Sequence, residues 1–358
     1  MRVALAGLPM SGKTCLFTAL SGGSVDSAAT PARADRPNAA MVPLPDPRLD
    51  WLAEHYQTPK RTPVQMEWID LPGLTPGRSD LVAQNTAIME HLRKSDALVY
   101  VVRAFESGRV PGRVDPKADL AALHGDFLLS DLEVVLRRIE KVEKQIAKPT
   151  PEREALKREL EFLGRCRAAL EGEKHLHEVV HNDAERAILR GFAALTEKCA
   201  LTVLNVGEGD AGNPEAVAAK HKDLAGPLLA LCASLEAEIG QLAPDERATF
   251  MQEMGLARLH APDLLWGVYN ALGRITYFTG GEKEVAARSI PRGTSAVVSA
   301  EDVHSDIARG FIRAEIVTFE DFKRAGSLKQ ARADGLARVE GRDYVVQDGD
   351  VILFHFSR

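Results

Sequence analysis

Eight residues near the N-terminus have the types and the spacing of a phosphate-binding loop. Gly7-Leu8-Pro9-Met10-Ser11-Gly12-Lys13-Thr14 fits the pattern G-x-x-x-x-G-K-[ST]. Glycines let the backbone curve closely around an anion, so that its N–H groups point at phosphate oxygens. Lys13 would neutralise phosphate charge, and the Thr14 hydroxyl would coordinate Mg²⁺. The pattern predicts nucleoside triphosphate binding with Mg²⁺ as cofactor, through Met10, Ser11, Gly12, Lys13, Thr14 and Cys15.

A second group of residues, Asp70-Leu71-Pro72-Gly73, directly follows the apolar run 64–69. In P-loop NTPases an aspartate at a strand end helps to hold Mg²⁺, and a glycine N–H senses the γ-phosphate. The position at a strand end supports this interpretation. We therefore expect Thr14 and Asp70 to be the metal ligands, and Lys13 and Gly73 to be the catalytic residues.

Two further groups follow later apolar runs. Asn205-Val206-Gly207-Glu208 closes the run 200–204, and Cys232-Ala233-Ser234 follows the run 228–231. Ligands of open α/β sheets bind at the carboxyl ends of the strands. We expect these groups to contribute nucleotide-binding residues, namely Asn205, Val206, Glu208, Cys232, Ala233 and Ser234.

The elements that must position these residues form an α/β pattern. Short apolar runs are separated by helix-length segments, which is typical of a mostly parallel sheet. The runs are 1–6, 64–69, 97–102, 200–204 and 228–231. We expect a nucleotide-binding domain made of residues 1–118 and 185–275.

Residues 119–184 have a different pattern, which predicts an inserted helical hairpin. Apolar residues recur at alternating spacings of four and three, as in a coiled-coil seam, until a break at 148–151. The seam residues are Leu128, Leu132, Val135, Ile139, Val142 and Ile146. Residues 128–180 hold 11 basic and 11 acidic residues. This balance leaves open whether the hairpin is a solvated arm or a docking arm.

Residues 276–358 change again to short β-like runs with Gly-rich turns, which predicts a small terminal α+β domain. The expected strands are 284–290, 311–317, 343–346 and 351–356. The domain holds 12 basic and 13 acidic residues. Its composition therefore gives no nucleic-acid signature.

Composition excludes several classes of protein. The chain has 358 residues, 45% of them hydrophobic and 27% charged, and a net charge of -6. That charge argues against a protein that coats nucleic acid, so we expect no direct DNA binding. Four widely spaced cysteines and the lack of any run of about 18 apolar residues indicate no disulfide framework and no membrane span. We expect a cytoplasmic monomer.

The chain resembles the YchF family, in the Obg group of translation-factor-class GTPases. The resemblance covers nearly the whole chain and includes segments outside the nucleotide motifs, namely 42–50, 276–279, 283–285, 306–314 and 343–350. It implies a P-loop NTPase G domain, a coiled-coil-like insertion and a C-terminal, β-grasp-like TGS domain at 276–358. It also implies the ribosome as a partner.

The resemblance also indicates which nucleotide the protein binds, ATP or GTP. Glu208 is one methylene longer than the aspartate of the GTPase N-K-x-D motif, so it does not automatically make the same two hydrogen bonds to guanine. Family members with N-x-x-E resemble ATPases more than GTPases. We therefore expect ATP to be favoured over GTP.

Several residues depart from the family or from GTPases in general. Leu74 stands where many GTPases place the glutamine that orients the attacking water. Ala34 replaces the threonine of the switch-one loop, Met10 replaces asparagine, Ser234 replaces lysine, and residues 77–80 lack a Gly-rich stretch. We expect slow hydrolysis, in a regulatory switch on the ribosome. The alternative is a nucleotide-binding scaffold with impaired hydrolysis.

One further motif allows a more distant alternative. His177-Glu178-Val179-Val180-His181 fits H-E-x-x-H, the zinc-peptidase helix in which two histidines hold the metal and the glutamate is the general base. No third histidine follows at the spacing of the metzincins. We therefore expect ordinary solvated histidines near a helix end.

Overall fold

The structure is a computed structural model that describes residues 1–23, 32–108, 110, 113–149, 151–224, 226–281 and 283–357. These residues belong to two units. The first consists of Met1–Met41 and Glu67–Ala261, and the second of Val42–Met66 and Pro262–Arg358. The chain passes from one unit to the other inside strand β2 (Asn38–Pro43), inside strand β4 (Gln65–Asp70), and at the first residue of helix α10 (Ala261–Ala271).

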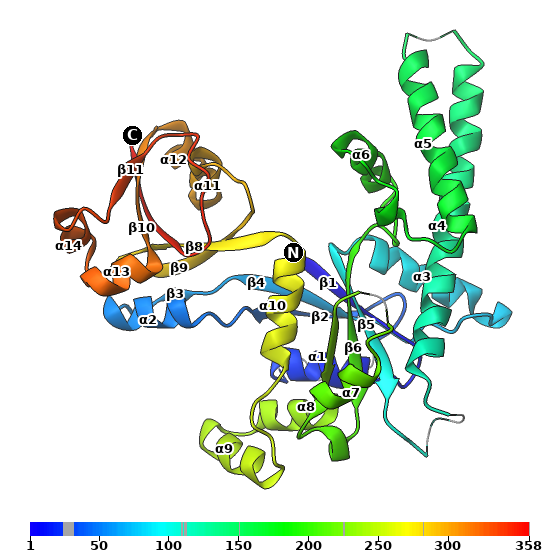
Figure 1. The fold of residues 1–358 in the computed structure, drawn as a ribbon, viewed down its shortest axis with the longest axis horizontal. Coiled ribbons are helices and arrows are strands. Elements are labelled where there is room, and N and C mark those ends of the chain that lie inside the picture. Colours follow the sequence, from blue (N-terminus) through cyan, green and yellow to red (C-terminus); the bar gives the residue numbers. More distant parts are fainter. Residues whose placement is uncertain are drawn as a thin grey trace. The chain divides into compact units, whose positions relative to one another are not determined.

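A six-stranded sheet forms the centre of the first unit, with the order β2-β4-β1-β5-β6-β7. β1 pairs in parallel with β4 and β5, β5 with β6, and β6 with β7 (Figure 1). The strands are β1 (Arg2–Ala6), β2 (Asn38–Pro43), β4 (Gln65–Asp70), β5 (Ala97–Ala104), β6 (Cys199–Val206) and β7 (Leu228–Leu231). The predicted mostly parallel sheet is confirmed, and the carboxyl ends of its parallel strands meet at one edge.

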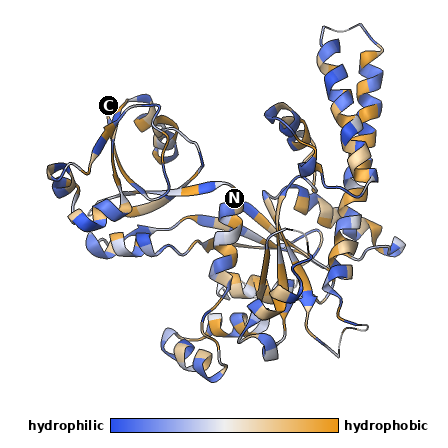
Figure 2. Ribbon diagram, viewed as in Figure 1, coloured by the Kyte–Doolittle hydropathy of each residue, from blue (hydrophilic) through white to orange (hydrophobic). Residues whose placement is uncertain are grey.

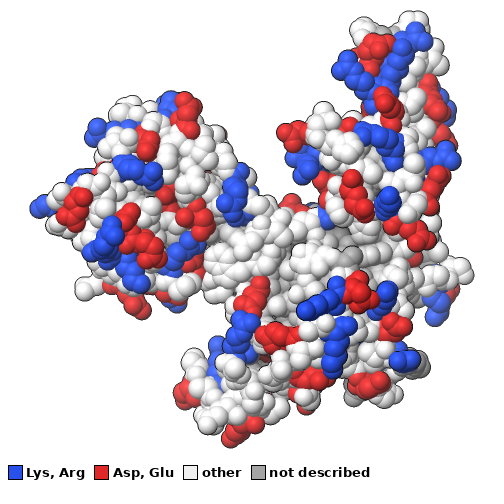
Figure 3. Space-filling view, in the orientation of Figure 1, with Lys and Arg blue, Asp and Glu red and all other residues white. Residues whose placement is uncertain are grey.

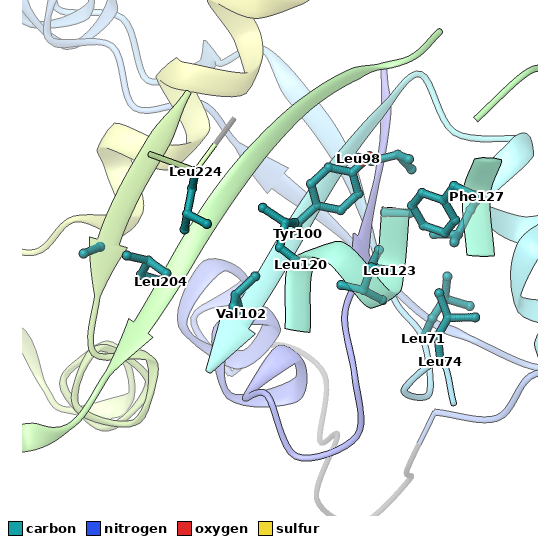
Figure 4. Packing of buried hydrophobic residues seen from close by; sticks show 14 of the residues in the cluster. Leu71, Leu74, Leu98, Tyr100, Val102, Leu120, Leu123, Phe127, Leu204 and Leu224 are labelled. Atoms are coloured by element: carbon teal, nitrogen blue, oxygen red, sulfur yellow. The ribbon is translucent and has the colours of Figure 1, made fainter. Parts of the chain in front are cut away.

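Helices cover this sheet, which explains why its central strands β1, β5 and β6 are apolar and buried along almost their whole length (Figure 2). Its core joins strand residues such as Tyr100 and Val102 to Leu120, Leu123 and Phe127 of helix α4 (Pro116–Ile146) (Figure 4). The helices are α1 (Lys13–Ser21), α3 (Val82–Arg93), α7 (Pro214–Lys220), α8 (Ala233–Gln241) and α9 (Pro244–Glu253), with short 3-10 helices at Ser79–Leu81 and Glu208–Asp210.

The predicted helical hairpin is formed by α4 (Pro116–Ile146) and α5 (Arg153–Glu171), which run side by side away from the sheet (Figure 1). The Asp115 side chain caps α4 by accepting a hydrogen bond from Ala118 N–H, and Pro116 fits the first turn. The seam residues pack in one cluster in which Val135 and Val142 are fully buried. Residue 150, in the break between the helices, lies outside the described residues. The 3-10 helix Leu176–Glu178 and α6 (Asp183–Gly191) lead back to the sheet.

The second unit contains another six-stranded sheet, with the order β11-β10-β12-β8-β9-β3. Its strands are β3 (Arg61–Thr62), β8 (Arg274–Gly280), β9 (Val285–Pro291), β10 (Phe311–Thr318), β11 (Arg338–Glu340) and β12 (Asp350–Phe356). Its other helices are α2 (Pro47–His55), α11 (Ala296–Val303), α12 (Ser305–Arg309), α13 (Phe319–Ala325) and α14 (Leu328–Ala333). Helices packed against a mixed sheet agree with the expected terminal α+β domain.

One expected strand of this unit is wrong. Residues 343–346 form only an isolated bridge between Val345 and Ser295, and β11 lies a few residues earlier. The reason is local, because Asp350 accepts hydrogen bonds from the Tyr344 hydroxyl and from Gln347 N–H and so holds this segment as a turn. The predicted domain boundaries at 118/119, 184/185 and 275/276 stay a prediction.

Among the residues that the structure describes, no helix is long and apolar enough to cross a membrane.

Candidate functional site

The phosphate-binding loop connects β1 to α1 with a backbone that requires glycine at two close approaches. Gly12 has a φ of +96°, and a Cβ there would lie 2.0 Å from Asn205 Nδ2. A Cβ on Gly7 would lie 2.5 Å from the Val101 carbonyl oxygen. No side chain caps α1, whose N-cap is Gly12. The first N–H groups of the helix are therefore available to an anion.

Lys13 is buried at the floor of this loop, and only 5% of it is exposed. Its Nζ donates hydrogen bonds to the carbonyl oxygens of Leu8, at 2.9 Å, and Gly7, at 3.2 Å. Burial lowers the pKa of Lys13 to about 8, although the nearby Asp70 charge acts in the opposite direction. Carbonyl oxygens of the phosphate-binding loop therefore hold the Lys13 ammonium group in place.

Thr14 and Asp70 come together although they are 56 residues apart. The Thr14 hydroxyl donates a hydrogen bond of 3.0 Å to Asp70 Oδ2 at the end of β4. Asp70 is fully buried, and its Oδ1 has no hydrogen-bond partner among the described residues. Burial raises the pKa of Asp70, against the opposing effects of the Thr14 hydrogen bond and the Lys13 charge. A buried carboxylate oxygen without a partner is costly unless a ligand satisfies it.

Asn205, at the end of β6, connects two loops of the site. Its Nδ2 donates to the Ser11 carbonyl oxygen, and its Oδ1 accepts from Ala233 N–H, each at 3.0 Å. Both ends of the amide are therefore used inside the protein. Asn205 fixes the phosphate-binding loop against the loop that follows β7.

A cavity of about 1010 Å³ lies at this edge of the sheet. The predicted site residues that line it are Met10, Gly12, Lys13, Thr14, Cys15, Gly73, Asn205, Val206, Glu208 and Ser234. The predicted residues that do not line it are Ser11, Asp70, Cys232 and Ala233, all of which are buried. Asp70 and Ala233 instead bind lining residues through the hydrogen bonds given above.

Sequence reasoning missed several lining residues, among them Phe105, Glu106 and Asp210. Ala104 pairs with Val206 at the ends of β5 and β6, so Phe105 and Glu106 continue from the paired strand end. A Cβ on Gly207 would lie 3.5 Å from Phe105 Cβ. The position of β5 in the sheet was the available signal, because ligands bind where parallel strands end.

The residues that depart from the pattern of other GTPases, at positions 34, 74 and 77–80, lie in different environments. Leu74 is 1% exposed within the core of the first unit, and its N–H donates to the Gly7 carbonyl oxygen at 3.0 Å. Figure 4 shows its side chain in the same packed group as Leu71 and Leu123. Ala34 is half-buried against the same core, whereas Ala32 lines the cavity. In residues 77–80, Gly77 has a φ of +72°, and exposed Arg78 and Asp80 form an ion pair.

The H-E-x-x-H segment does not form the helix that a zinc peptidase requires. His177 and Glu178 end a single 3-10 turn, Leu176–Glu178, and His181 lies beyond it. His177 Nδ1 lies 3.2 Å from the Thr196 carbonyl oxygen, and Glu178 accepts a hydrogen bond from His175 N–H. In the described part of the chain, no group of three or more His, Cys, Asp or Glu residues could hold a metal ion.

Comparison with known proteins places this site in a family. Residues 2–143 match a model described as "50S ribosome-binding GTPase", and residues 274–357 match the YchF-GTPase_C model, described as "Protein of unknown function (DUF933)". The chain is 36% identical to "Ribosome-binding ATPase YchF" of Bacillus subtilis, over 99% of this chain and 98% of the relative. The protein of that name from Escherichia coli O157:H7 gives the same identity and coverage.

More distant relatives agree along the whole chain. "Obg-like ATPase 1" of Gallus gallus is 29% identical over 100% of this chain and 92% of the relative. The solved structure of the Schizosaccharomyces pombe YchF GTPase has a TM-score of 0.86 at 27% identity, and covers 99% of this chain and 97% of that one. The resemblance inferred from the motifs is therefore confirmed, and the chain belongs to the YchF family of P-loop NTPases.

Proposed function

We propose that this protein binds ATP with Mg²⁺, hydrolyses it slowly, and acts as a switch on the ribosome. The observation that carries the proposal is the phosphate-binding loop with buried Lys13 at its floor and the Thr14–Asp70 pair beside it. Relatives over 99% of the chain are named ribosome-binding ATPases. A protein that acts on the ribosome would be cytoplasmic.

The residues present fit a magnesium ion. Asp70 Oδ1 is buried without a partner, and the Thr14 hydroxyl lies beside the other oxygen of that carboxylate. Oxygen ligands of this kind are those that Mg²⁺ prefers. A bound Mg²⁺ would supply positive charge to the β- and γ-phosphate oxygens.

The charges that line the cavity give a reason for the metal. Lys13 is the one basic lining residue of the described cavity, and Glu106, Glu208 and Asp210 are acidic. A triphosphate would meet a net negative lining, so backbone N–H groups and Lys13 alone leave its charge poorly balanced. Nucleotide affinity should therefore depend strongly on Mg²⁺.

Hydrolysis rests on positioning by this chain's own residues. Lys13 would neutralise phosphate charge. Gly73 packs directly against the phosphate-binding loop, since a Cβ at position 73 would lie 2.3 Å from Pro9 N, and its N–H is the group that we assign to the γ-phosphate. The described residues offer no side chain at position 74 to orient water, since Leu74 faces the core. Slow intrinsic turnover follows, and the ribosome is the proposed source of acceleration.

The base is expected to lie at the end of the cavity formed by Phe105 and Glu208. Phe105 offers an aromatic face for stacking, and Glu208 accepts hydrogen bonds from an exocyclic amine. We favour adenine because Glu208 lacks the aspartate geometry that reads guanine. Phe105→Ala should weaken ATP binding and leave tripolyphosphate binding unchanged.

The proposal is tested by calorimetric titration with ATP and GTP, with and without Mg²⁺. Wild type should bind ATP at least as tightly as GTP, Lys13→Ala should lose most of its affinity, and Glu208→Asp should shift preference toward GTP. Lys220→Ala changes an exposed lysine outside the cavity and is the matched control. Equal triphosphate affinity in wild type and Lys13→Ala would refute the site.

Single-turnover hydrolysis with and without purified ribosomes separates the switch from its alternative. A measurable rate that ribosomes raise supports the switch. No hydrolysis under either condition supports a nucleotide-binding scaffold, which buried Leu74 and the missing hydroxyl at Ala34 favour. The zinc peptidase retains no supporting observation beyond its motif.

A further inference from the structure

We propose that the distal arm, residues 137–149 and 151–158 of the helical hairpin, docks on the phosphate backbone of ribosomal RNA. This inference rests on the proposed function, because it names the part of the protein that meets the ribosome. It comes from the distribution of charge along α4 and α5 and from the way in which these two helices pack.

The charge of the hairpin is balanced in total but separated in space. The distal arm has eight basic and four acidic residues, a net charge of +4. The remainder of 128–180 has three basic and seven acidic residues, a net charge of -4. Figure 3 shows Lys and Arg side chains gathered at the far end of the arm. Since the whole chain carries -6, the residues outside the distal arm carry -10.

The basic residues of α4 form one stripe. Arg137, Lys141, Lys144 and Lys148 are spaced by four, three and four residues, so they follow one face of the helix and its C-terminal turn. All four are exposed. Among the described residues, no carboxylate lies within ion-pair distance of any of them; Arg137 Nε donates only to the Glu133 carbonyl oxygen. At 1.5 Å per residue the stripe is roughly 16 Å long.

The packing of the arm decides between possible anionic partners. The apolar face of α4, including Val135 and Val142, is already buried against α5. An amphipathic helix binds a lipid surface by inserting its apolar face, which is not available here. A rigid row of unpaired cations suits the regular charges of a nucleic-acid backbone, where binding releases condensed counterions. The rest of the chain is acidic, so RNA would be attracted most favourably to this end.

The test compares wild type with the double variant Lys141→Glu and Lys144→Glu. The control, Lys220→Glu with Lys222→Glu, changes net charge equally at exposed positions outside the arm. Co-sedimentation with purified 70S ribosomes is measured over a range of KCl concentrations, and ATP affinity is measured in parallel. Thermal unfolding checks that both variants are folded.

The arm variant should lose tenfold or more in ribosome affinity at about 0.1 M salt. The slope of log affinity against log salt should fall by about 1.5, because each lost phosphate contact removes about 0.7 to 0.9. ATP affinity and the control should match wild type. Unchanged affinity and slope in the arm variant would overturn the inference while the ribosome-associated function stands. If wild type itself does not bind ribosomes, the proposed function fails, and the inference with it.

A competition arm identifies the chemistry of the partner. Purified ribosomal RNA should displace the wild-type protein from ribosomes, whereas poly-glutamate and vesicles of anionic phospholipid, at equal charge concentration, should not. Displacement by poly-glutamate or by vesicles without displacement by RNA would show an acidic protein or a lipid surface as the partner, and would overturn the assignment to RNA.

Discussion

Asp131 and Arg93 form a buried ion pair at the base of the helical arm, with 2.8 Å between Asp131 Oδ1 and Arg93 Nη1. Asp131 lies in α4 and Arg93 is the last residue of α3. The same carboxylate accepts hydrogen bonds from Leu195 N–H, Thr196 N–H and the Thr196 hydroxyl, at 2.8 to 3.0 Å. One buried side chain thus ties the arm to the helix after the Gly73 loop and to the entry of β6.

Asp131→Ala is expected to destabilise the protein strongly. It would take the carboxylate away from the Arg93 guanidinium, which would keep only its neutral acceptors, the Ala193 carbonyl oxygen and Ser130 Oγ, and would leave two backbone N–H groups without an acceptor. Asp131 is only 1% exposed in this site. Breaking a buried ion pair in this way costs about 3 to 5 kcal/mol. Urea unfolding measures the change in the free energy of unfolding.

The control for that measurement is Glu171→Gln, which removes the exposed ion pair between Arg167 and Glu171. Pairs of this kind contribute about 0.5 kcal/mol or less. A loss below about 1 kcal/mol in Asp131→Ala would mean that the pair is not what holds the arm to the sheet.

The conformation of the phosphate-binding loop predicts a difference between substitutions at the two glycines that flank α1, Gly12 before it and Gly22 after it. Gly12→Ala should abolish ATP binding, because its Cβ would lie 2.0 Å from Asn205 Nδ2 at a φ of +96°. Gly22→Ala also places alanine at a positive φ, +58°, but meets no atom within 4 Å. It should cost about 1 kcal/mol of stability and leave ATP affinity unchanged. ATP titration of both variants measures the two affinities. If Gly12→Ala and Gly22→Ala have equal ATP affinity, the close approach of position 12 to Asn205 does not determine nucleotide binding.

Strands β1, β4, β5, β6 and β7 and the phosphate-binding loop could be predicted because their signals are local. Parallel strands buried on both faces give apolar runs, and the loop needs glycine at fixed spacings. β2 was not predicted, because its residues alternate between buried and exposed but are small or interrupted by Pro43, which weakens the pattern. The role of Asn205 was also hidden, since its partners Ser11 and Ala233 are 194 and 28 residues away along the chain.

Phe105 shows a second limit of what can be predicted from the sequence. It follows β5 in the chain but belongs to the cavity because β5 lies beside β6 in the sheet. Strand order comes from tertiary packing, and no local pattern encodes it. The segment 343–346 shows the converse, since Tyr344 and Gln347 turn toward Asp350 where the apolar pattern favoured a strand.

The buried Lys13 ammonium predicts a pH-dependent stability. Its folded pKa of about 8 lies below the ordinary value of 10.5, so the folded state loses this proton before the unfolded state does. The cost of burying the charge is therefore fully present below pH 8 and disappears as the pH rises from 8 to 10.5. Without nucleotide, Lys13→Met should be more stable than wild type at pH 7 by about 1 to 3 kcal/mol.

This stability difference should narrow between pH 8 and 10.5. Urea unfolding of wild type and Lys13→Met across that range measures it, with Lys220→Met as the exposed control. Lys13→Met should also lose ATP binding, so that stability rises as function is lost. If the difference in the free energy of unfolding between wild type and Lys13→Met stays constant with pH, burial of a charged Lys13 does not destabilise the folded protein.

The last prediction concerns Leu74, which occupies the place of a water-orienting glutamine in many GTPases. Replacing it by glutamine would restore catalysis if the side chain faced the nucleotide. In this structure the Leu74 N–H is bonded to the Gly7 carbonyl oxygen, and the side chain is 1% exposed in the core beside Leu71 and Leu123. Leu74→Gln would bury an amide without partners and remove apolar contacts.

We therefore expect Leu74→Gln to lower the free energy of unfolding by about 2 to 4 kcal/mol and not to raise the single-turnover rate of ATP hydrolysis. Leu74→Met keeps the volume and polarity of the site, so it should cost less than about 1.5 kcal/mol and leave the rate unchanged. Urea unfolding and rapid-quench hydrolysis assays measure the two quantities. A Leu74→Gln variant as stable as wild type and tenfold faster would contradict this prediction, because its side chain would then have to face the nucleotide. The slow turnover that we propose would then result from the core that holds Leu74, and a single substitution at that position should not relieve it.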